Sequence, residues 1–191
     1  QDLVISRALV ELFGRPAIAR GLAFRGGTAL YKLHLRPARR YSEDIDLVQV
    51  TAGPAGPMID AIRQVLDSWL GEPRRVAKAG SFSLHYHVLG ESEPPILIRL
   101  KVEVNTREHA PVMGLAHVPF RVENRWFNGE AEVITYPLEE LLGTKIRALY
   151  QRKKSRDLFD LWEASRHANI DPRRIVACFL TYMERDAMRV S

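Results

Sequence analysis

Two short motifs near the N-terminus carry side chains that could do chemistry on a phosphate. The first is Gly26-Gly27-Thr28, and the second contains Asp44 and Asp46 with one apolar residue between them. Glycines let a backbone approach a phosphate closely, and a hydroxyl and the free N–H groups of a following helix supply hydrogen-bond donors. Two carboxylates on one strand face repel each other unless a cation lies between them. Together the motifs predict a site for magnesium and a nucleoside triphosphate.

Each motif alone has an ordinary structural explanation, which the sequence leaves open. A Gly-Gly-Thr turn commonly does no more than end a strand and cap a helix, and an Asp-x-Asp pair commonly lies on a solvated strand edge. The Gly-x-x-x-x-Gly-Lys-Ser/Thr pattern of P-loop proteins is absent from the chain, which disfavours that class. The short distance between the two motifs favours a shared site.

The first motif lies at a predicted strand-to-helix turn. Residues 22–24 are apolar and predict a short strand, which Gly26-Gly27 interrupts. Thr28 can cap a helix that continues to about residue 35, and Pro37 prevents its continuation. This arrangement would direct the N-terminal N–H groups of the helix towards a phosphate.

The second motif is predicted to lie on a half-buried strand. Residues 44–50 alternate in polarity, so Asp44 and Asp46 would share one face while Ile45 and Leu47 point into the core. Carboxylates are hard oxygen ligands of the kind that hold magnesium together with substrate phosphates. Two such ions can stabilise both the attacking and the leaving oxygen in nucleotidyl transfer.

Apolar residues at helical or alternating spacing predict regular elements in most of the remaining chain. The predicted helices cover residues 3–13, 58–70, 137–150, 156–167 and 172–185. The predicted strands cover residues 82–89, 96–105 and 132–136. Residues 106–130 show no regular pattern and are expected to be irregular. The first two thirds of the chain are thus expected to be mixed α/β and the end helical, with no internal repeat.

The composition favours a folded protein with an anionic partner. The chain has 191 residues, 46% of them hydrophobic, and could form one globular unit or two small lobes. Its net charge is +5 and its isoelectric point is near 9.6, which makes nucleic acid a natural partner. Basic clusters occur at residues 36–40, 74–78, 152–156 and 173–174, although each could equally be a solvated surface.

The remaining composition excludes several classes of protein. The single cysteine, Cys178, lies in the apolar run 175–180, which excludes an intrachain disulfide and a cysteine-rich metal site and predicts a core position. No stretch has the roughly 18 consecutive apolar residues of a transmembrane helix, and no signal-like segment opens the sequence. We therefore expect no membrane partner and a reducing, cytoplasmic setting.

The order of the two motifs resembles the signature of the DNA polymerase β-like nucleotidyltransferase superfamily. Gly26-Gly27-Thr28-Ala29-Leu30 is followed by Arg40-Tyr41-Ser42-Glu43-Asp44-Ile45-Asp46-Leu47. Within the superfamily, the sequence is most similar to the AbiEii/AbiGii-type toxins of bacterial type IV toxin–antitoxin systems, which include the mycobacterial MenT group. The resemblance continues through residues 138–149, Arg152 and residues 156–162, so that it frames most of the chain.

The resemblance implies a fold as well as an activity. The fold class would be α/β (α+β), with a polymerase β-like core in which helices flank a small mixed sheet. Residues 1–136 would form the nucleotidyltransferase core lobe. Residues 137–191 would form a helical C-terminal lobe that completes the active site.

The resemblance also implies roles for individual residues. Asp44 and Asp46 would bind the magnesium that carries the nucleoside triphosphate. Nucleotide binding would involve Gly26, Gly27, Thr28, Lys145 and Arg156. Thr28 stands where the family usually has a serine, a change that keeps the hydroxyl. Asp157 would be essential and is a candidate base.

The helical pattern itself singles out Lys145. Leu138, Leu141, Leu142 and Leu149 fall on one helical stripe, and Lys145 occupies a position on that stripe where an apolar residue is expected. A buried ammonium group needs an anion. The alternative is that the stem is buried while the amine reaches water.

Two further carboxylates are less distinctive in the sequence alone. The superfamily places a third metal ligand on a neighbouring strand, and the alternation around Glu103 suits that role. The alternative is an exposed charged face that Glu103 shares with Arg99 and Lys101. Asp157 lies in the first turn of a predicted helix, where the helix dipole favours a carboxylate by roughly 0.3–1 kcal/mol in any case.

Two other pairs have weaker claims to a role. His85 and His87 share a strand face, but neither a cysteine nor a third ligand nearby completes a zinc set. Arg39 and Arg40 lie beside the acidic pair and could contact phosphate or RNA, or could merely balance local charge.

These inferences together predict a magnesium-dependent nucleotidyltransferase. A hydroxyl of the acceptor would attack the α-phosphorus of a nucleoside triphosphate, and pyrophosphate would leave. The resemblance and the basic surface point to RNA as acceptor, foremost the 3′ end of tRNA, whose modification would block translation. The resemblance also implies a cognate antitoxin, which need not bind the toxin stably. Two alternatives stay open: a small-molecule nucleotidyltransferase of the antibiotic-modifying kind, and a non-catalytic RNA-binding domain.

Overall fold

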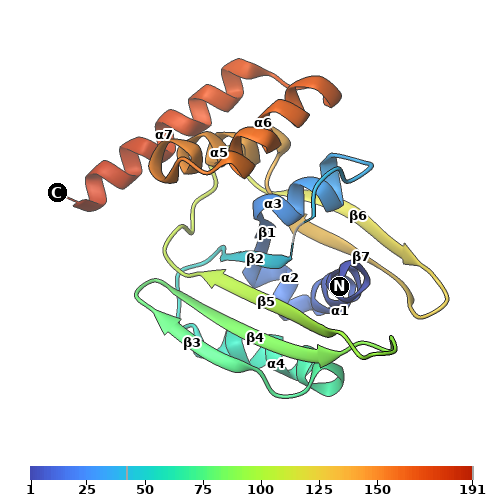
Figure 1. The fold of residues 1–191 in the computed structure, drawn as a ribbon. Coiled ribbons are helices and arrows are strands. Elements are labelled where there is room, and N and C mark those ends of the chain that lie inside the picture. Colours follow the sequence, from blue (N-terminus) through green and yellow to red (C-terminus); the bar gives the residue numbers. More distant parts are fainter. Residues whose placement is uncertain (42, 191) are drawn as a thin grey trace.

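A mixed sheet of seven strands forms the centre of the computed structural model, which describes residues 1–41 and 43–190 (Figure 1). Its strands are β1 (Leu22–Arg25), β2 (Asp44–Gln49), β3 (Arg74–Lys78), β4 (Ser81–Leu89), β5 (Leu97–Asn105), β6 (Ala116–Glu123) and β7 (Asn128–Thr135). They lie in the order β3-β4-β5-β2-β1-β7-β6, with parallel pairing between β2 and β5 and between β1 and β7. Ser42, which belongs to the quoted signature, lies outside the described residues.

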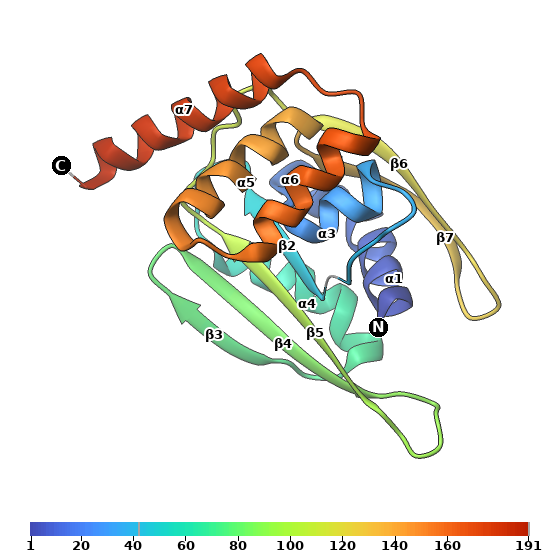
Figure 2. The ribbon, with the colours of Figure 1, turned by 45° about the horizontal axis from the view of Figure 1, so that its top comes forward.

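Helices lie on both sides of this sheet. They are α1 (Asp2–Phe13), α2 (Pro16–Gly21), α3 (Gly26–Ala29), the π-helical turn η1 (Leu30–His34), α4 (Gly56–Leu70), α5 (Leu138–Arg152), α6 (Ser155–His167) and α7 (Pro172–Val190). α1, α2 and α4 contact one another and the sheet, whereas α5, α6 and α7 gather beside α3 and η1 (Figures 1 and 2). No helix in the described part of the chain is long and apolar enough to cross a membrane. The predicted fold class, a mixed sheet flanked by helices, is confirmed.

The alternation predicted for β2 is present in the structure. Ile45 and Leu47 are fully buried, while Asp44 and Asp46 are partly exposed on the opposite face. β2 lies inside the sheet, between β5 and β1. The buried side chains thus hold one face of β2 against the core, and the carboxylates on the other face can line a cavity.

Two parts of the sheet differ from the prediction. Residues 106–130 are not irregular throughout, because they contain β6 and the start of β7. β6 is an edge strand, which tolerates Pro119 because no neighbour is present on one side, and of its residues only Phe120 and Val122 are buried. β3, the opposite edge, was not predicted either, because four of its five residues are exposed and no apolar alternation marks it.

The first motif also differs from the prediction in detail. The helix begins at Gly26, with Arg25 as its N-cap, so Thr28 is a helical residue and not the cap. The helix continues directly into the π-helical turn η1 and ends at His34. Gly26 has a φ of +84°, a conformation that glycine adopts without the steric strain of other residues. This backbone conformation, and not a threonine cap, makes the sharp strand-to-helix turn.

A buried carboxylate on α5 links the C-terminal helices to the rest of the chain. Glu140 on α5 accepts hydrogen bonds from the backbone N–H groups of Val112 and Met113, at 2.7 and 2.8 Å, and from Tyr182 Oη on α7 at 2.7 Å. Cys178 is buried between α7 and α5, which confirms its predicted core position. The division into lobes of residues 1–136 and 137–191 stays a prediction.

Candidate active site

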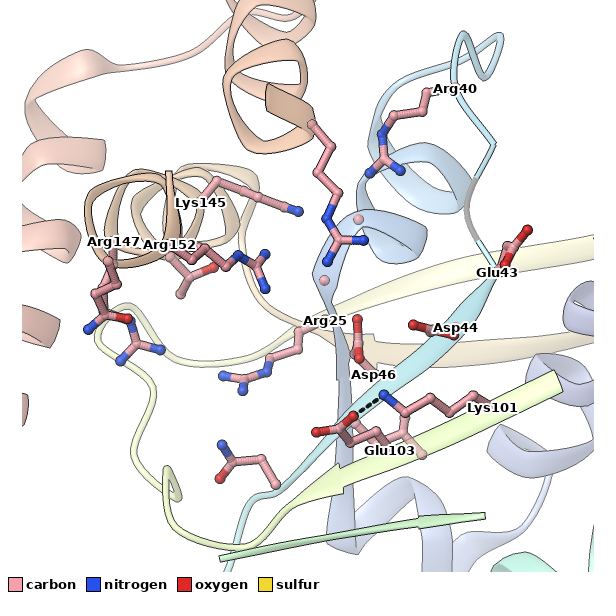
Figure 3. Close-up of a pocket in the computed structure, with 18 of the residues that line it drawn as sticks. Arg25, Arg40, Glu43, Asp44, Asp46, Lys101, Glu103, Lys145, Arg147 and Arg152 are labelled. Carbon is pink, nitrogen blue, oxygen red and sulfur yellow. Dashed lines mark hydrogen bonds and ion pairs between the residues drawn. The ribbon is translucent and has the colours of Figure 1, made fainter. Parts of the chain in front are cut away.

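A cavity of about 550 Å³ lies where β2 and β5 face α5 (Figure 3). Its basic lining residues are Arg25, Arg40, Lys101, Lys145, Arg147, Arg152 and Arg156, and its acidic ones are Glu43, Asp44, Asp46 and Glu103. Asp44, Asp46 and Glu103 are called the carboxylate wall below. Lys145, Arg152 and Arg156 are called the basic wall. Such a site can hold a cation and a polyanion together.

The register of the sheet builds the carboxylate wall. β2 pairs with β5 in parallel, and Asp46 lies directly beside Glu103 while Asp44 lies beside Lys101. Residues paired in this way point to the same face of a sheet. Glu103 therefore lies on the same face as Asp46, and it forms an ion pair with Lys101.

The electrostatics of Asp46 indicate what this wall can bind. Burial raises the pKa of the Asp46 carboxyl, and the charges of Asp44 and Glu103 raise it further, although Arg25 and Lys101 act in the opposite direction. A divalent cation between the oxygens would offset this repulsion, and magnesium prefers oxygen donors of this kind. Asp44 and Asp46 therefore fit a magnesium ion.

Glu103 is a weaker candidate for a metal ligand. Its carboxylate is paired with Lys101, so this ion pair would have to open before Glu103 could bind a cation. Within the described residues, no group of three or more His, Cys, Asp or Glu side chains is already gathered as a metal site. The metal role of Glu103 stays a prediction.

Gly26 and Gly27 lie between the two walls, close to side chains on each side. A Cβ atom on Gly26 would overlap the Asp46 carboxylate, and one on Gly27 would overlap the Arg40 guanidinium and lie 3.5 Å from Lys145 Nζ. The backbone of the first motif therefore approaches the carboxylates on one side and the cations on the other. Only residues without a side chain make room for the Asp46 carboxylate and the Arg40 guanidinium at these positions.

Thr28 and Asp157 are the two predicted site residues that do not line the cavity. Thr28 is buried, and its Oγ1 donates a 2.5 Å hydrogen bond to the carbonyl oxygen of Asp44. This hydroxyl thus joins the two motifs and fixes the start of β2. The phosphate contact predicted for Thr28 finds no support in this geometry.

We expect the variant Gly26→Ala to lose most of the activity of the site. The added methyl group would displace the Asp46 carboxylate, and a misplacement of about 1 Å can reduce a rate roughly 100-fold. Positive φ alone costs a non-glycine residue about 1–2 kcal/mol. Gly71→Ala is the matched control, because Gly71 has a φ of +77° but no atom within 4 Å of its added Cβ. Thermal unfolding and activity of both variants check this expectation, and equal activity would contradict it.

Lys145 lies in a buried network of charges. The side chain is 9% exposed, and Nζ lies 3.2 Å from Asp157 Oδ1 and 2.9 Å from Asp160 Oδ2. The alternative of an amine that reaches past the surface into water therefore does not apply. Asp157 and Asp160 are therefore the anions that a buried ammonium group needs. Lys145 also lines the cavity.

Asp157 is fully buried beneath the basic wall. Arg152 donates to both of its oxygens at 2.9 Å, and Lys145 donates to Oδ1. Burial alone would raise the pKa of this carboxyl, but the hydrogen bonds from Arg152 and the charge of Lys145 outweigh burial and lower it. Asp157 is thus an anion that holds two cations of the site in place.

Asp160 is a member of this network that the sequence analysis missed. It is fully buried and accepts hydrogen bonds from Arg40 Nε and Nη2 at 2.8 and 3.0 Å, and from Tyr31 Oη at 3.0 Å. Arg40 therefore belongs to the site as a partner of Asp160. The signal in the sequence is the spacing of Asp157, Asp160 and Glu163, which places acids on one face of α6, and all three are buried.

A family model described as "Nucleotidyl transferase AbiEii toxin, Type IV TA system" matches residues 7–190. No curated protein sequence matches the chain significantly.

Several solved structures are similar to this one at 19% sequence identity. The nucleotidyltransferase toxin MenT4 of Mycobacterium tuberculosis H37Rv superposes with a TM-score of 0.65 over 93% of this chain and 61% of its own. JHP933 of Helicobacter pylori gives a TM-score of 0.56 over 87% of this chain and 65% of its own. An antigenic nucleotidyltransferase-like protein of Paracoccidioides brasiliensis gives 0.57, over 96% and 87%. The chain thus shares its fold with these proteins but spans less than two thirds of the length of the first two.

Proposed function

This chain belongs to the AbiEii family of nucleotidyl transferase toxins from type IV toxin–antitoxin systems, and from that premise we propose that it transfers a nucleoside monophosphate from a nucleoside triphosphate to RNA. The acceptor in this proposal is the 3′ end of tRNA, whose modification stops translation. The oxygen of the terminal hydroxyl forms a bond to the α-phosphorus, the bond to pyrophosphate breaks, and the hydroxyl proton passes to solvent. A cognate antitoxin and a cytoplasmic setting belong to the same proposal.

The observation that carries the proposal is the pair of walls on one cavity. A nucleoside triphosphate bound to a divalent cation presents a positive ion together with negatively charged phosphate oxygens. In the proposal the carboxylate wall takes the ion and the basic wall takes the phosphates. Figure 3 shows Asp44, Asp46 and Glu103 on the strands and Lys145 and Arg152 on α5. Gly26 and Gly27 let the Asp46 carboxylate and the Arg40 guanidinium lie directly against the backbone between the walls.

Each residue of the site has a task in this proposal. Asp44 and Asp46 hold the magnesium ion, which when bound neutralises charge on the phosphates and activates the α-phosphorus for attack. Lys145 and Arg156 bind the phosphates electrostatically. The site then works mainly by positioning its reactants and by balancing charge.

Asp157 acts in this proposal as a positioning residue and not as a base. Its pKa is lowered, and its oxygens already accept hydrogen bonds from Lys145 and Arg152. A general base works best with a pKa near the working pH. Asp157 is instead suited to fix the two cations that meet the phosphates.

The charge of the chain favours RNA as the acceptor. The net charge of +5 and the excess of cations in the cavity suit a polyanion better than a small neutral molecule. The chain spans 61% of the length of MenT4.

One experiment separates this proposal from its two alternatives. The protein is incubated with magnesium, labelled nucleoside triphosphates and unfractionated tRNA, and the products are resolved by size. We expect label in tRNA, and at least a tenfold loss of label with Lys145→Ala because the amine of the basic wall is removed. Label incorporated without RNA would support a small acceptor instead. Tight tRNA binding without transfer of any nucleotide would contradict the proposed enzyme.

A further inference from the structure

The sheet carries a second basic surface that begins at the carboxylate wall and leads away from α5. Across the strands, Asp44 is paired with Lys101, Lys101 with His85, and His85 with Arg74. Residues paired across neighbouring strands lie on the same face. One row of side chains therefore runs from the cavity to the β3 edge, with a cation at Lys101 and another at Arg74.

The next row on this face pairs Val76 with Ser83 and Ser83 with Glu103, and the row beyond it is polar and basic. Lys78 is paired with Ser81 on β4, and Ser81 with Asn105 on β5. Another row pairs His87 with Arg99. The opposite face of the same strands is the core, where Leu84, Tyr86, Leu100 and Val102 are buried. The two faces thus differ completely in character, and the polar one is available to a partner.

This face is open and hollowed in the structure. A hollow of about 330 Å³ is lined by Arg74, Lys78, Ser83, His85, Lys101 and Glu103, together with Val76 and Ser81. Lys101 and Glu103 also line the active-site cavity, so the two spaces adjoin. In Figure 2, β3, β4 and β5 extend beyond α5 and α6, and no helix of the described chain is drawn over this extending part.

Apart from Lys101, which is paired with Glu103, the lysine and arginine residues described on this face lack acidic partners. Among the described residues, neither Arg74, Lys78 nor Arg99 forms an ion pair with a carboxylate, although many of the cations around the active-site cavity do. Burial lowers the pKa of His85, and the charges of Lys101 and Arg74 lower it further. The face therefore presents unbalanced positive charge, which suits a phosphate backbone.

We propose that this face of β3, β4 and β5 binds the sugar–phosphate backbone of the acceptor RNA and directs its terminal hydroxyl to the carboxylate wall. The inference rests on the proposed function. In phosphoryl transfer the attacking and leaving oxygens lie roughly in line. If the leaving pyrophosphate lies against the basic wall, the acceptor must enter from the opposite side of the carboxylates. That side is the surface formed by β5, β4 and β3.

The length of the surface suits a short single strand. Adjacent strands lie about 4.8 Å apart, so Arg74 on β3 is roughly 14 Å from Asp44 on β2. At 3.4 Å for each stacked nucleotide of a strand, this distance corresponds to about four nucleotides. The end of a single strand would therefore lie at the carboxylate wall while its preceding phosphates meet Lys101 and Arg74.

Neighbouring residues on β3 provide a matched test. Arg74 and Arg75 are both exposed, but alternation directs them to opposite faces of the strand. Arg74→Glu and Arg75→Glu therefore make the same charge change one residue apart, and only the first alters the proposed surface. Lys78→Glu is a second variant on the proposed face. Circular dichroism and thermal unfolding show whether each variant is folded.

Two measurements are made on the four proteins. The first is binding of unfractionated tRNA at several salt concentrations without nucleotide, and the second is KM for tRNA and for the nucleoside triphosphate during transfer. For Arg74→Glu and Lys78→Glu, we expect about tenfold weaker tRNA binding, a salt dependence whose logarithmic slope is smaller by roughly 0.7–0.9, and an unchanged KM for the triphosphate. Arg75→Glu should match the wild type within about twofold.

Different outcomes would contradict the RNA-binding face and the proposed nucleotidyl transfer. Equal tRNA binding by Arg74→Glu and Arg75→Glu would overturn the inference even if transfer to tRNA occurs. Absence of transfer by the wild type would overturn the proposed function, while a selective binding defect in Arg74→Glu would still support an RNA-binding face. Transfer to a protein or a small acceptor, with no difference between the two variants, would overturn both.

Discussion

Replacing Asp46 with asparagine is expected to abolish nucleotidyl transfer while leaving the protein folded. Asp46 lies beside Glu103 and against Gly26, and asparagine keeps the shape but removes the charge that holds a cation. We expect kcat to fall at least roughly 1,000-fold, which corresponds to about 4 kcal/mol of activation free energy. Initial rates of label transfer to tRNA at saturating magnesium and nucleotide measure this effect.

The stability of the Asp46→Asn variant should distinguish a lost cation site from a lost fold. Because the folded-state pKa of Asp46 is raised, the ionised carboxylate opposes folding at neutral pH, and its removal should keep or increase the melting temperature. Magnesium should raise the melting temperature of the wild type but not of the variant.

Glu43→Gln is the control for a carboxylate at the rim of the cavity. Glu43 also lines the cavity, but it is exposed and lies one residue before β2. Its replacement should change the rate by less than about threefold. Near-normal transfer by Asp46→Asn, or an equal loss in Glu43→Gln, would contradict the assignment of the carboxylate wall.

The sequence was sufficient to predict those parts of the site that depend on local patterns. Alternation placed Asp44 and Asp46 on one face of β2, and the interrupted stripe singled out Lys145, because both patterns are set by periodicities of a few residues. The resemblance to a known family then joined motifs that lie about a hundred residues apart. The mixed sheet and the helical C-terminus could be predicted for the same reasons.

Features that depend on pairing between distant segments could not be predicted. The two edge strands were missed for local reasons instead. β3 has mostly exposed residues and little apolar alternation. β6 does alternate, with Val118, Phe120 and Val122 on one face, but Pro119 interrupts the run. The partners of Asp160 come from η1, the segment after it, and α5, and no local pattern indicates such contacts. The open basic face likewise depends on the register of four strands.

Replacing Asp157 with asparagine is expected to reduce stability and nucleotide affinity together. The change would leave Lys145 and Arg152 without one of their buried acceptors, and breaking a buried ion pair on one side costs about 3–5 kcal/mol. We expect about 3 kcal/mol, the lower end of this range, because the Arg152 side chain is 43% exposed and water can partly replace its partner. Urea-induced unfolding of the two proteins measures the difference.

The pH dependence of this difference follows from the lowered pKa of Asp157. A carboxyl whose pKa is lower in the folded than in the unfolded state stabilises the fold fully above the unfolded pKa, near 4, and loses this effect as the pH falls through the folded pKa. The stability difference between wild type and Asp157→Asn should therefore be constant from about pH 6 to 8 and shrink below about pH 4. Glu123→Gln, which removes an exposed ion pair with Arg121, should show only a small difference throughout.

Kinetics of the same variant distinguish a positioning residue from a base. If Asp157 positions Lys145 and Arg152, Asp157→Asn should raise KM for the nucleoside triphosphate more than it lowers kcat. The pH–rate profile should keep its acidic limb, because no catalytic proton acceptor has been removed. If Asp157 were the base, kcat would fall with an unchanged KM and that limb would disappear. The second pattern would show that Asp157 takes part in proton transfer and does not only position the basic wall. The hydrogen bonds from Arg152 to Asp157 would then have to break during each turnover.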